Sequence, residues 1–272
     1  MSANFVAREL GYHMPNGWGQ GDQATQESFR PVATFAARFD GMLAEIKSLG
    51  FTAMDLWGAH LHYTWATPDH VTTARALLEK HGLHVVSYAS WVPGGEAELR
   101  TACQLCRELE IPLIGGFIEL VANDRALAVR VLRESAIVYG YENHPEKSVD
   151  EILAKLGTGD EDVIGLAVDT GWLGTRGIDA PAAVRRLAPR MKHIHLKDVK
   201  ARRAEKTGFE FIDMGHETCR LGAGMVGAQA IVTSLPSLGY RGAISVEHEP
   251  EDFDPRADCA ASLALIRQWL SG

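Results

Sequence analysis

The chain has 272 residues, with 27 Lys and Arg against 35 Asp and Glu, which gives a formal net charge of −8. The apolar fraction of 46% and the charged fraction of 23% are ordinary for a globular protein and exclude a disordered or fibrous chain. No apolar window is long enough for a membrane span, residues 1–10 lack the pattern of a secretory signal, and the acidic balance argues against a nucleic-acid partner.

Eight short apolar runs alternate with amphipathic stretches along the chain. Each run has four to seven residues and is nearly continuous, which is typical of parallel strands buried on both faces. The predicted strands are Glu9–His13, Thr52–Trp57, Leu83–Tyr88, Pro112–Phe117, Ala136–Glu142, Val163–Asp169, Met191–Leu196 and Ala243–Glu247.

The stretches between these runs have apolar residues at helical spacing. Two of them also begin with a helix-start signal: Thr67 precedes Pro68, and Ser148 is followed by Glu151 in a capping box. The predicted helices are Ala36–Leu49, Pro68–His81, Glu96–Leu109, Asn123–Arg133, Ser148–Leu156, Asp179–Leu187, Val226–Leu235 and Arg256–Leu270.

Strict alternation of strands and helices predicts βα units around a parallel sheet. Eight units in a chain of this length match a (β/α)8 TIM barrel, and we expect a single domain over residues 1–272. An open doubly wound sheet is the alternative, but the Gly-rich fingerprint that usually follows its first strand is absent.

Four consecutive predicted strands end in residues able to bind a metal ion: Glu142, Asp169, His195 and Glu247. The carboxyl ends of the strands form the active-site face of such a barrel. Three carboxylates and one imidazole suit a single divalent cation, with Mn²⁺ favoured and Mg²⁺, Co²⁺ or Zn²⁺ as alternatives. Taken singly, each residue could instead be a loop carboxylate, a helix cap or a core histidine.

Two further polar residues share a strand face with these candidates, because side chains two positions apart point the same way. Lys197 follows His195 by two positions, and His144 follows Glu142 by two. Both are candidates for polarising a substrate oxygen or moving a proton. The alternatives are a salt bridge at the barrel rim for Lys197 and a solvated loop position for His144.

Aromatic residues gather after predicted strands, where flat apolar walls suit sugar rings. Trp57, Trp91 and Trp172 are candidate substrate-binding residues, although each could simply cover the barrel core. His13 and His60 add weaker polar candidates near the first two strands.

The segment Val199–Gly224 is long for a connection in a barrel, and such loops are often lids or subunit contacts. His216 and Arg220 within it are candidates for reaching over the site. Cys103 and Cys106 form a CxxC without a second pair, so we interpret them as small apolar residues facing the barrel. Four cysteines without a disulfide framework fit a cytoplasmic protein.

The chain resembles the xylose isomerase-like TIM-barrel superfamily of sugar phosphate isomerases and epimerases. The matching motifs are AMDLW, ENH, LAVDTG, HIHLKD, LGAG and GYRGAISVE, in order from Gly50 to Glu247. The resemblance implies that Glu142, Asp169, His195 and Glu247 hold one divalent metal. It also implies that Glu142 and Glu247 flank the substrate carbon as an acid/base pair.

HIHLKDV followed by an insertion with GFEFIDMG is also similar to the inosose dehydratase branch. One departure is Trp172, which stands where the family often has the histidine of DTGH. We therefore expect a small-molecule keto sugar or keto-inositol substrate, acted on by a metal-dependent isomerase or epimerase. A lyase of the inosose dehydratase or C-deglycosidase type and a non-catalytic sugar-binding barrel subunit remain alternatives, and the chain could act as a homo-oligomer or beside a partner subunit.

Overall fold

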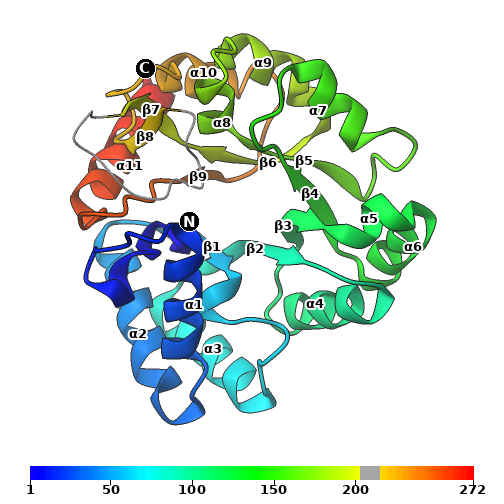
Figure 1. Cartoon of the computed structure of the whole chain (residues 1–272), viewed down its shortest axis with the longest axis vertical. Helices are drawn as coiled ribbons and strands as arrows, with labels where there is room; N and C mark the ends of the chain where they lie inside the picture. The colour runs from blue at the N-terminus through cyan, green and yellow to red at the C-terminus, as the bar shows by residue number, and fades with distance from the viewer. Residues whose placement is uncertain (203–214) are drawn as a thin grey trace.

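A computed structural model of the chain describes residues 1–202 and 215–272. Seven parallel strands follow one another in the order β1-β2-β3-β4-β5-β6-β9, and Figure 1 shows them arranged in a ring with helices outside. Their bounds are β1 Ala53–Trp57, β2 His84–Val92, β3 Leu113–Ile118, β4 Val138–Glu142, β5 Ile164–Asp169, β6 Met191–Leu196 and β9 Ile244–Val246. A separate antiparallel pair, β7 (Asp198–Ala201) and β8 (His216–Cys219), follows β6.

Helices cover the outside of the ring and bury their apolar stripes against the strands. Thr67 caps α3 with a reciprocal bond to His70, and Ser148 accepts a hydrogen bond from the Glu151 amide at the start of α7, as their positions predict. The helix bounds are α1 Trp18–Phe29, α2 Val32–Ser48, α3 Pro68–His81, α4 Glu96–Glu108, α5 Glu119–Asn123, α6 Arg125–Ser135, α7 Val149–Leu156, α8 Thr170–Thr175, α9 Ala180–Leu187, α10 Ala228–Ser234 and α11 Arg256–Ser271.

The prediction of a strand at Glu9–His13 is wrong. Residues Arg8–Leu10 form a 3-10 turn, and Gly11 and Tyr12 both have positive φ angles, of 62° and 61°. Two successive left-handed residues cannot continue a strand. Glu9 is instead held by Ser28 and Arg38, which donate to its carboxylate at 2.6 and 3.0 Å.

The N-terminal 3-10 turn Ser2–Phe5 lies between β9 and β1, where the seven-stranded sheet is open (Figure 1). The Trp57 amide donates to Ser2 Oγ at 2.8 Å, on the β1 side. On the β9 side, Asn4 donates to the Val246 carbonyl at 3.0 Å and accepts from the His248 amide at 2.9 Å. Side-chain hydrogen bonds thus bridge the two edge strands, and the fold is a nearly closed barrel of the (β/α)8 class.

The core is continuous and apolar, and β5 is buried along its whole length. Cys103 and Cys106 are buried and free, in keeping with their interpretation as small apolar residues, and burial raises the pKa of the Cys103 thiol to about 11. Among the described helices, none has the length and apolarity that crossing a membrane requires.

Candidate active site and metal centre

The ends of β4 and β5 are joined by the side chain of Asn143. Its amide nitrogen donates to the Asp169 carbonyl and its oxygen accepts from the Asp169 amide, both at 2.9 Å. These bonds extend the ladder by one step beyond the β4–β5 pairing that ends with Glu142 opposite Ala167. Glu142 and Asp169 are therefore held at fixed positions on neighbouring strand ends.

The ends of β5 and β6 are joined in a similar way by Thr170. Its hydroxyl lies 2.8 Å from the Lys197 carbonyl and 2.9 Å from the Lys197 amide. Within the ladder, Asp169 lies opposite His195, and the Glu247 amide donates to the Leu196 carbonyl at 3.1 Å. The backbone thus delivers acidic, imidazole and ammonium groups to one end of the barrel.

Glu142, His195 and Glu247 form a compact group whose ligand atoms all lie within 4.8 Å of one another. His195 Nδ1 is 2.7 Å from Glu142 Oε1 and 3.3 Å from Glu247 Oε2. Asp169 lies beside this group without belonging to it, and its Oδ2 is 3.7 Å from Lys197 Nζ. The four predicted ligands therefore converge, with three of them in direct proximity.

Lys197 Nζ is the cationic partner of this acidic group. It donates to Glu247 at 2.9 Å and to Glu249 at 3.0 Å, and the Lys197 residue is only 4% exposed. Burial alone would lower its pKa, but Glu247 and Glu249 raise the pKa of this ammonium well above its usual value. The predicted salt bridge at the barrel rim is present, in a buried setting.

The charges of the group also set the proton affinities of its members. Burial would raise the pKa of Glu142, but His195 outweighs it and lowers the pKa of Glu142 to about 2. Conversely, burial would lower the pKa of His195, but Glu142 and Glu247 raise it to about 10. Buried carboxylates here attract any cation that can reach them.

Several ligand-type atoms of the cluster lack a hydrogen-bond partner among the described residues. They are Asp169 Oδ2, Glu247 Oε2 and His195 Nε2, all fully buried as atoms. Buried polar atoms are normally hydrogen-bonded, and within the described part of the chain the two carboxylate oxygens have only the ion-pair contacts given above, so they can accept a further partner. Three carboxylates and an imidazole suit a hard or borderline divalent cation, and the residues present therefore fit such an ion.

A pocket of about 690 Å³ opens above this group. Asp169 and His195 are fully buried beneath it and do not line it. Trp172, which is only 6% exposed, lies against His144 with ring centroids 5.6 Å apart. The predicted site residues that do line the pocket are Glu142, His144, Lys197, Glu247, Trp57, Trp91 and Trp172.

Four other predicted residues are not among those that line this pocket. His60 is buried behind the wall, where its ring meets Trp57 and Phe29 at centroid distances of 5.4 and 4.6 Å. His13 is exposed on the turn that replaces the first predicted strand. His216 begins β8, and Arg220 follows that strand at the surface. The GFEFIDMG motif of the predicted lid falls mainly in residues 203–214, outside the described residues.

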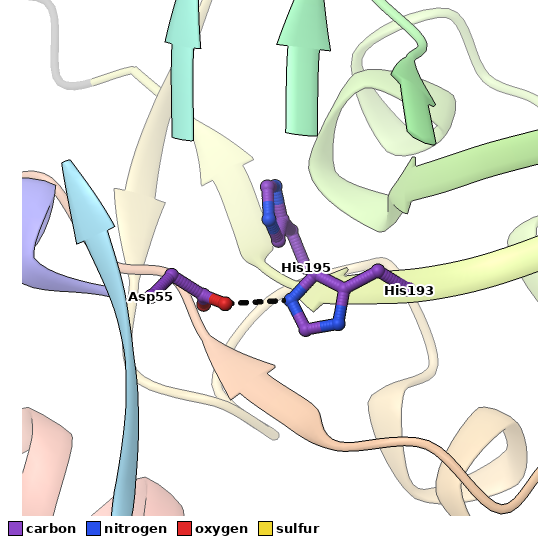
Figure 2. Close-up of side chains that lie close together, drawn as sticks. All are labelled: Asp55, His193 and His195. Atoms are coloured by element: carbon purple, nitrogen blue, oxygen red, sulfur yellow. Dashed lines mark ion pairs between the residues drawn. The ribbon is translucent and has the colours of Figure 1, made fainter. Parts of the chain in front are cut away.

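The structure adds Asp55 and His193, to which the sequence analysis gave no role. Figure 2 shows Asp55 of β1 facing His193 of β6, with Asp55 Oδ1 2.8 Å from His193 Nε2. Ser87 and Ser245 donate to the same carboxylate. Asp55, His193 and His195 form a second group of residues of metal-ligand type, whose ligand atoms lie within 4.8 Å of one another. In this group the carboxylate already has hydrogen-bond partners. The two-residue spacing of His193 and His195 was the available signal.

The side chain of Asp198 binds the backbone of the LGAG motif, which lies in the turn after β8. Its carboxylate accepts backbone hydrogen bonds from Val199, Gly222, Gly224 and Val226, at 2.9 to 3.1 Å. A Cβ on Gly224 would collide with this carboxylate, so only glycine fits the close approach. The turn after β8 is thereby tied to the end of β6.

The family profile described as "Xylose isomerase-like TIM barrel" matches residues 43–269. The match covers most of the chain and agrees with the barrel fold, so the protein belongs to this family. Proteins of the family include isomerases, epimerases and dehydratases that act on sugars and related compounds.

Three known proteins show what the chain is similar to in sequence or in fold. Inosose dehydratase of Clostridium beijerinckii is 31% identical over 141 residues, which are 49% of this chain and 47% of that protein, so the chain spans about half the length of this curated relative. A xylose isomerase-like TIM-barrel protein from Mycobacterium smegmatis in complex with magnesium has a TM-score of 0.67 at 20% identity, covering 89% of each chain. The apo form of 3-keto-D-glucoside 4-epimerase from E. coli has a TM-score of 0.61 at 14% identity, covering 85% of this chain and 94% of that one. These two structures are similar in fold.

Proposed function

We propose that the protein is a divalent-metal-dependent isomerase or epimerase that removes and returns a proton next to the carbonyl of a keto sugar. The observation that carries the proposal is the convergence of Glu142, His195 and Glu247 within 4.8 Å at the floor of the pocket. Asp169 supplies a further buried oxygen without a hydrogen-bond partner among the described residues. A divalent ion held by these four residues would supply Lewis-acid polarisation of the substrate oxygens.

The chain's own residues would transfer the proton and stabilise the developing negative charge. Glu142 and Glu247 both line the pocket, so either carboxylate can take a proton from a substrate carbon lying between them. The other carboxylate can return a proton to the same carbon or to its neighbour. Lys197 already donates to Glu247, and its ammonium can stabilise negative charge that develops on a substrate oxygen.

The aromatic lining supports a cyclic substrate. Trp57, Trp91 and Trp172 offer apolar faces, and an indole at the Trp172 position cannot serve as a metal ligand as histidine can. The chain is also similar in fold to 3-keto-D-glucoside 4-epimerase, whose name gives a cyclic keto sugar as its substrate. We therefore favour keto-inositols or 3-keto-glycosides over open-chain ketohexoses.

The test follows hydrogen exchange by NMR in D2O with added Mn²⁺. Deuterium incorporation next to the carbonyl, with the carbon skeleton and substituents retained, is the expected result. Metal content is measured in parallel for wild type, Glu142→Gln and His195→Ala. The matched controls are Glu108→Gln and His84→Ala, which alter exposed residues away from the pocket. Full metal content in both site variants would contradict the proposed ligand set.

A lyase reaction is the second candidate, and the 31% identity to inosose dehydratase favours it. The first step is the same removal of a proton beside the carbonyl. Expulsion of water or another group from the adjacent carbon then replaces the return of the proton. Appearance of an enone or of a released leaving group in the same NMR experiment would identify this reaction.

A further inference from the structure

Two exposed aromatic side chains stand at the mouth of the pocket. Trp91 is 64% exposed and Phe117 is 37% exposed, whereas Trp57 and Trp172 in the same pocket are 4% and 6% exposed. Trp91 and Phe117 are also register partners on the adjacent strands β2 and β3. Their side chains therefore lie on the same face of the sheet at neighbouring positions, and we call the two together the β2–β3 patch.

The β2–β3 patch lines the same cavity as Glu142 and Glu247 but comes from other strands. Phe117 belongs to β3, which pairs with β4, the strand that ends at Glu142, whereas Trp91 belongs to β2, two strands away from β4. The cavity of about 690 Å³ is within the range of about 300–1,000 Å³ that encloses drug-sized ligands. A single sugar ring held at Glu142 and Glu247 would occupy only part of such a cavity.

The chemistry of this end is apolar and flat. Trp18 also lines the pocket and packs edge-on against Trp57, with ring centroids 4.9 Å apart. Among the described residues, neither Trp91 nor Phe117 makes a ring contact with another aromatic side chain. Large aromatic faces left open to solvent commonly mark a binding surface, because covering them with an apolar group is favourable.

We infer that the β2–β3 patch is a subsite for an aromatic substituent on the substrate. The substrate class is then a keto-glycoside whose sugar ring lies at the carboxylates and whose aromatic aglycone covers Trp91 and Phe117. This inference rests on the proposed function for the position of the sugar ring. The residues of the subsite come from strands other than those that carry the proposed metal ligands.

The test measures binding without turnover, using unoxidised phenyl β-D-glucoside and methyl β-D-glucoside as probes. Calorimetry is performed with wild type, Trp91→Ala, Phe117→Ala and the control Leu270→Ala, which removes a 48% exposed side chain outside the pocket. We expect wild type to bind the phenyl glycoside about tenfold more tightly than the methyl glycoside. That preference should fall to about twofold or less in Trp91→Ala, should weaken in Phe117→Ala, and should remain in Leu270→Ala.

The inference is wrong if wild type shows no phenyl preference, or if the preference survives both pocket substitutions. It is also wrong if Trp91→Ala changes the oligomeric state while the phenyl preference stays intact, because the patch would then be a contact between subunits. Failure of the proposed function has a different signature. Methyl and phenyl 3-keto-glucosides would then show no deuterium exchange, whatever the probes reveal about the patch.

Discussion

Asp55 and His193 form a buried ion pair inside the barrel, with Asp55 Oδ1 2.8 Å from His193 Nε2 and side-chain exposures of 0% and 3% (Figure 2). Burial would raise the pKa of Asp55, but His193 holds it well below its usual value. The pair links β1 to β6 across the ring, directly beneath the candidate metal ligand His195. It therefore contributes both to the stability of the barrel and to the position of that ligand.

Substituting His193 by Phe should destabilise the fold strongly, because it removes the imidazole that pairs with the buried Asp55 carboxylate. Losses of about 3–5 kcal/mol are typical for such a change. The measurement is urea unfolding in the presence of a chelator, so that metal binding does not enter. Lys80→Met is the control: it breaks the exposed Lys80–Asp40 pair of 2.8 Å and should cost much less, because solvent screens exposed ion pairs. Equal losses in the two variants would refute a structural role for the buried pair.

Glu247→Gln should retain a side chain of the same shape while removing a carboxylate that can exchange a proton. We expect turnover of the true substrate to fall by about 10²–10⁴-fold, the usual contribution of a general acid or base. Glu249→Gln is the matched comparison, because Glu249 also accepts from Lys197, at 3.0 Å, and should have the smaller effect. Metal analysis of both variants separates loss of the ion from loss of proton transfer, and near wild-type turnover in Glu247→Gln would exclude its acid/base role.

Trp172→His tests whether the indole selects cyclic substrates. The substitution replaces an indole with one ring nitrogen by an imidazole with two, and it removes apolar surface from the pocket wall that includes His144. We expect kcat/KM for cyclic keto substrates to fall relative to open-chain ketohexoses, by about tenfold. If wild type already prefers simple ketohexoses and the substitution leaves that preference unchanged, Trp172 has only a packing role.

His60 should make stability depend on pH below neutrality. Burial, together with Arg8, lowers its pKa to about 3, whereas an unfolded histidine titrates near 6.5. The folded state therefore binds the proton more weakly, and the contribution of neutral His60 to stability is present above about pH 6.5 and is lost progressively as pH falls toward 3. Linkage gives a slope of about 1.4 kcal/mol per pH unit within that window.

The measurement compares urea unfolding of wild type and His60→Asn between pH 7 and pH 5. The free energy of unfolding should depend less steeply on pH in the variant, by the slope that corresponds to roughly one bound proton. His84→Asn changes an exposed histidine and should leave the slope as in wild type. An unchanged slope in His60→Asn would contradict the inference that His60 stays neutral in the folded protein.

The ends of β4 and β5 were predictable because each run is continuous and stops at an acidic residue. Glu142, Asp169 and His195 are the last or next-to-last residues of their strands, so chain order alone brings them to one rim. Helix α8 was not predicted, because its six residues hold two glycines and only the Asp169 carboxylate, which accepts from the Gly171 amide, caps its start.

Other features depend on contacts between distant parts of the chain. The run Glu9–His13 has the composition of a strand, but backbone handedness at Gly11 and Tyr12 is invisible to periodicity. Asp55 and His193 meet only because the sheet curves into a nearly closed barrel, which brings β1 and β6 to face each other. His60 follows a strand end as Trp57 does, yet only the three-dimensional packing decides that one lines the pocket and the other lies behind it.

The Asp198 carboxylate fastens the chain just after β6 to the turn at Gly222, Gly224 and Val226. Because one carboxylate binds backbone on both sides of β7 and β8, the two ends of this segment are joined to each other. Lys197, the residue before Asp198, is therefore anchored from two directions, by β6 and by the turn after β8.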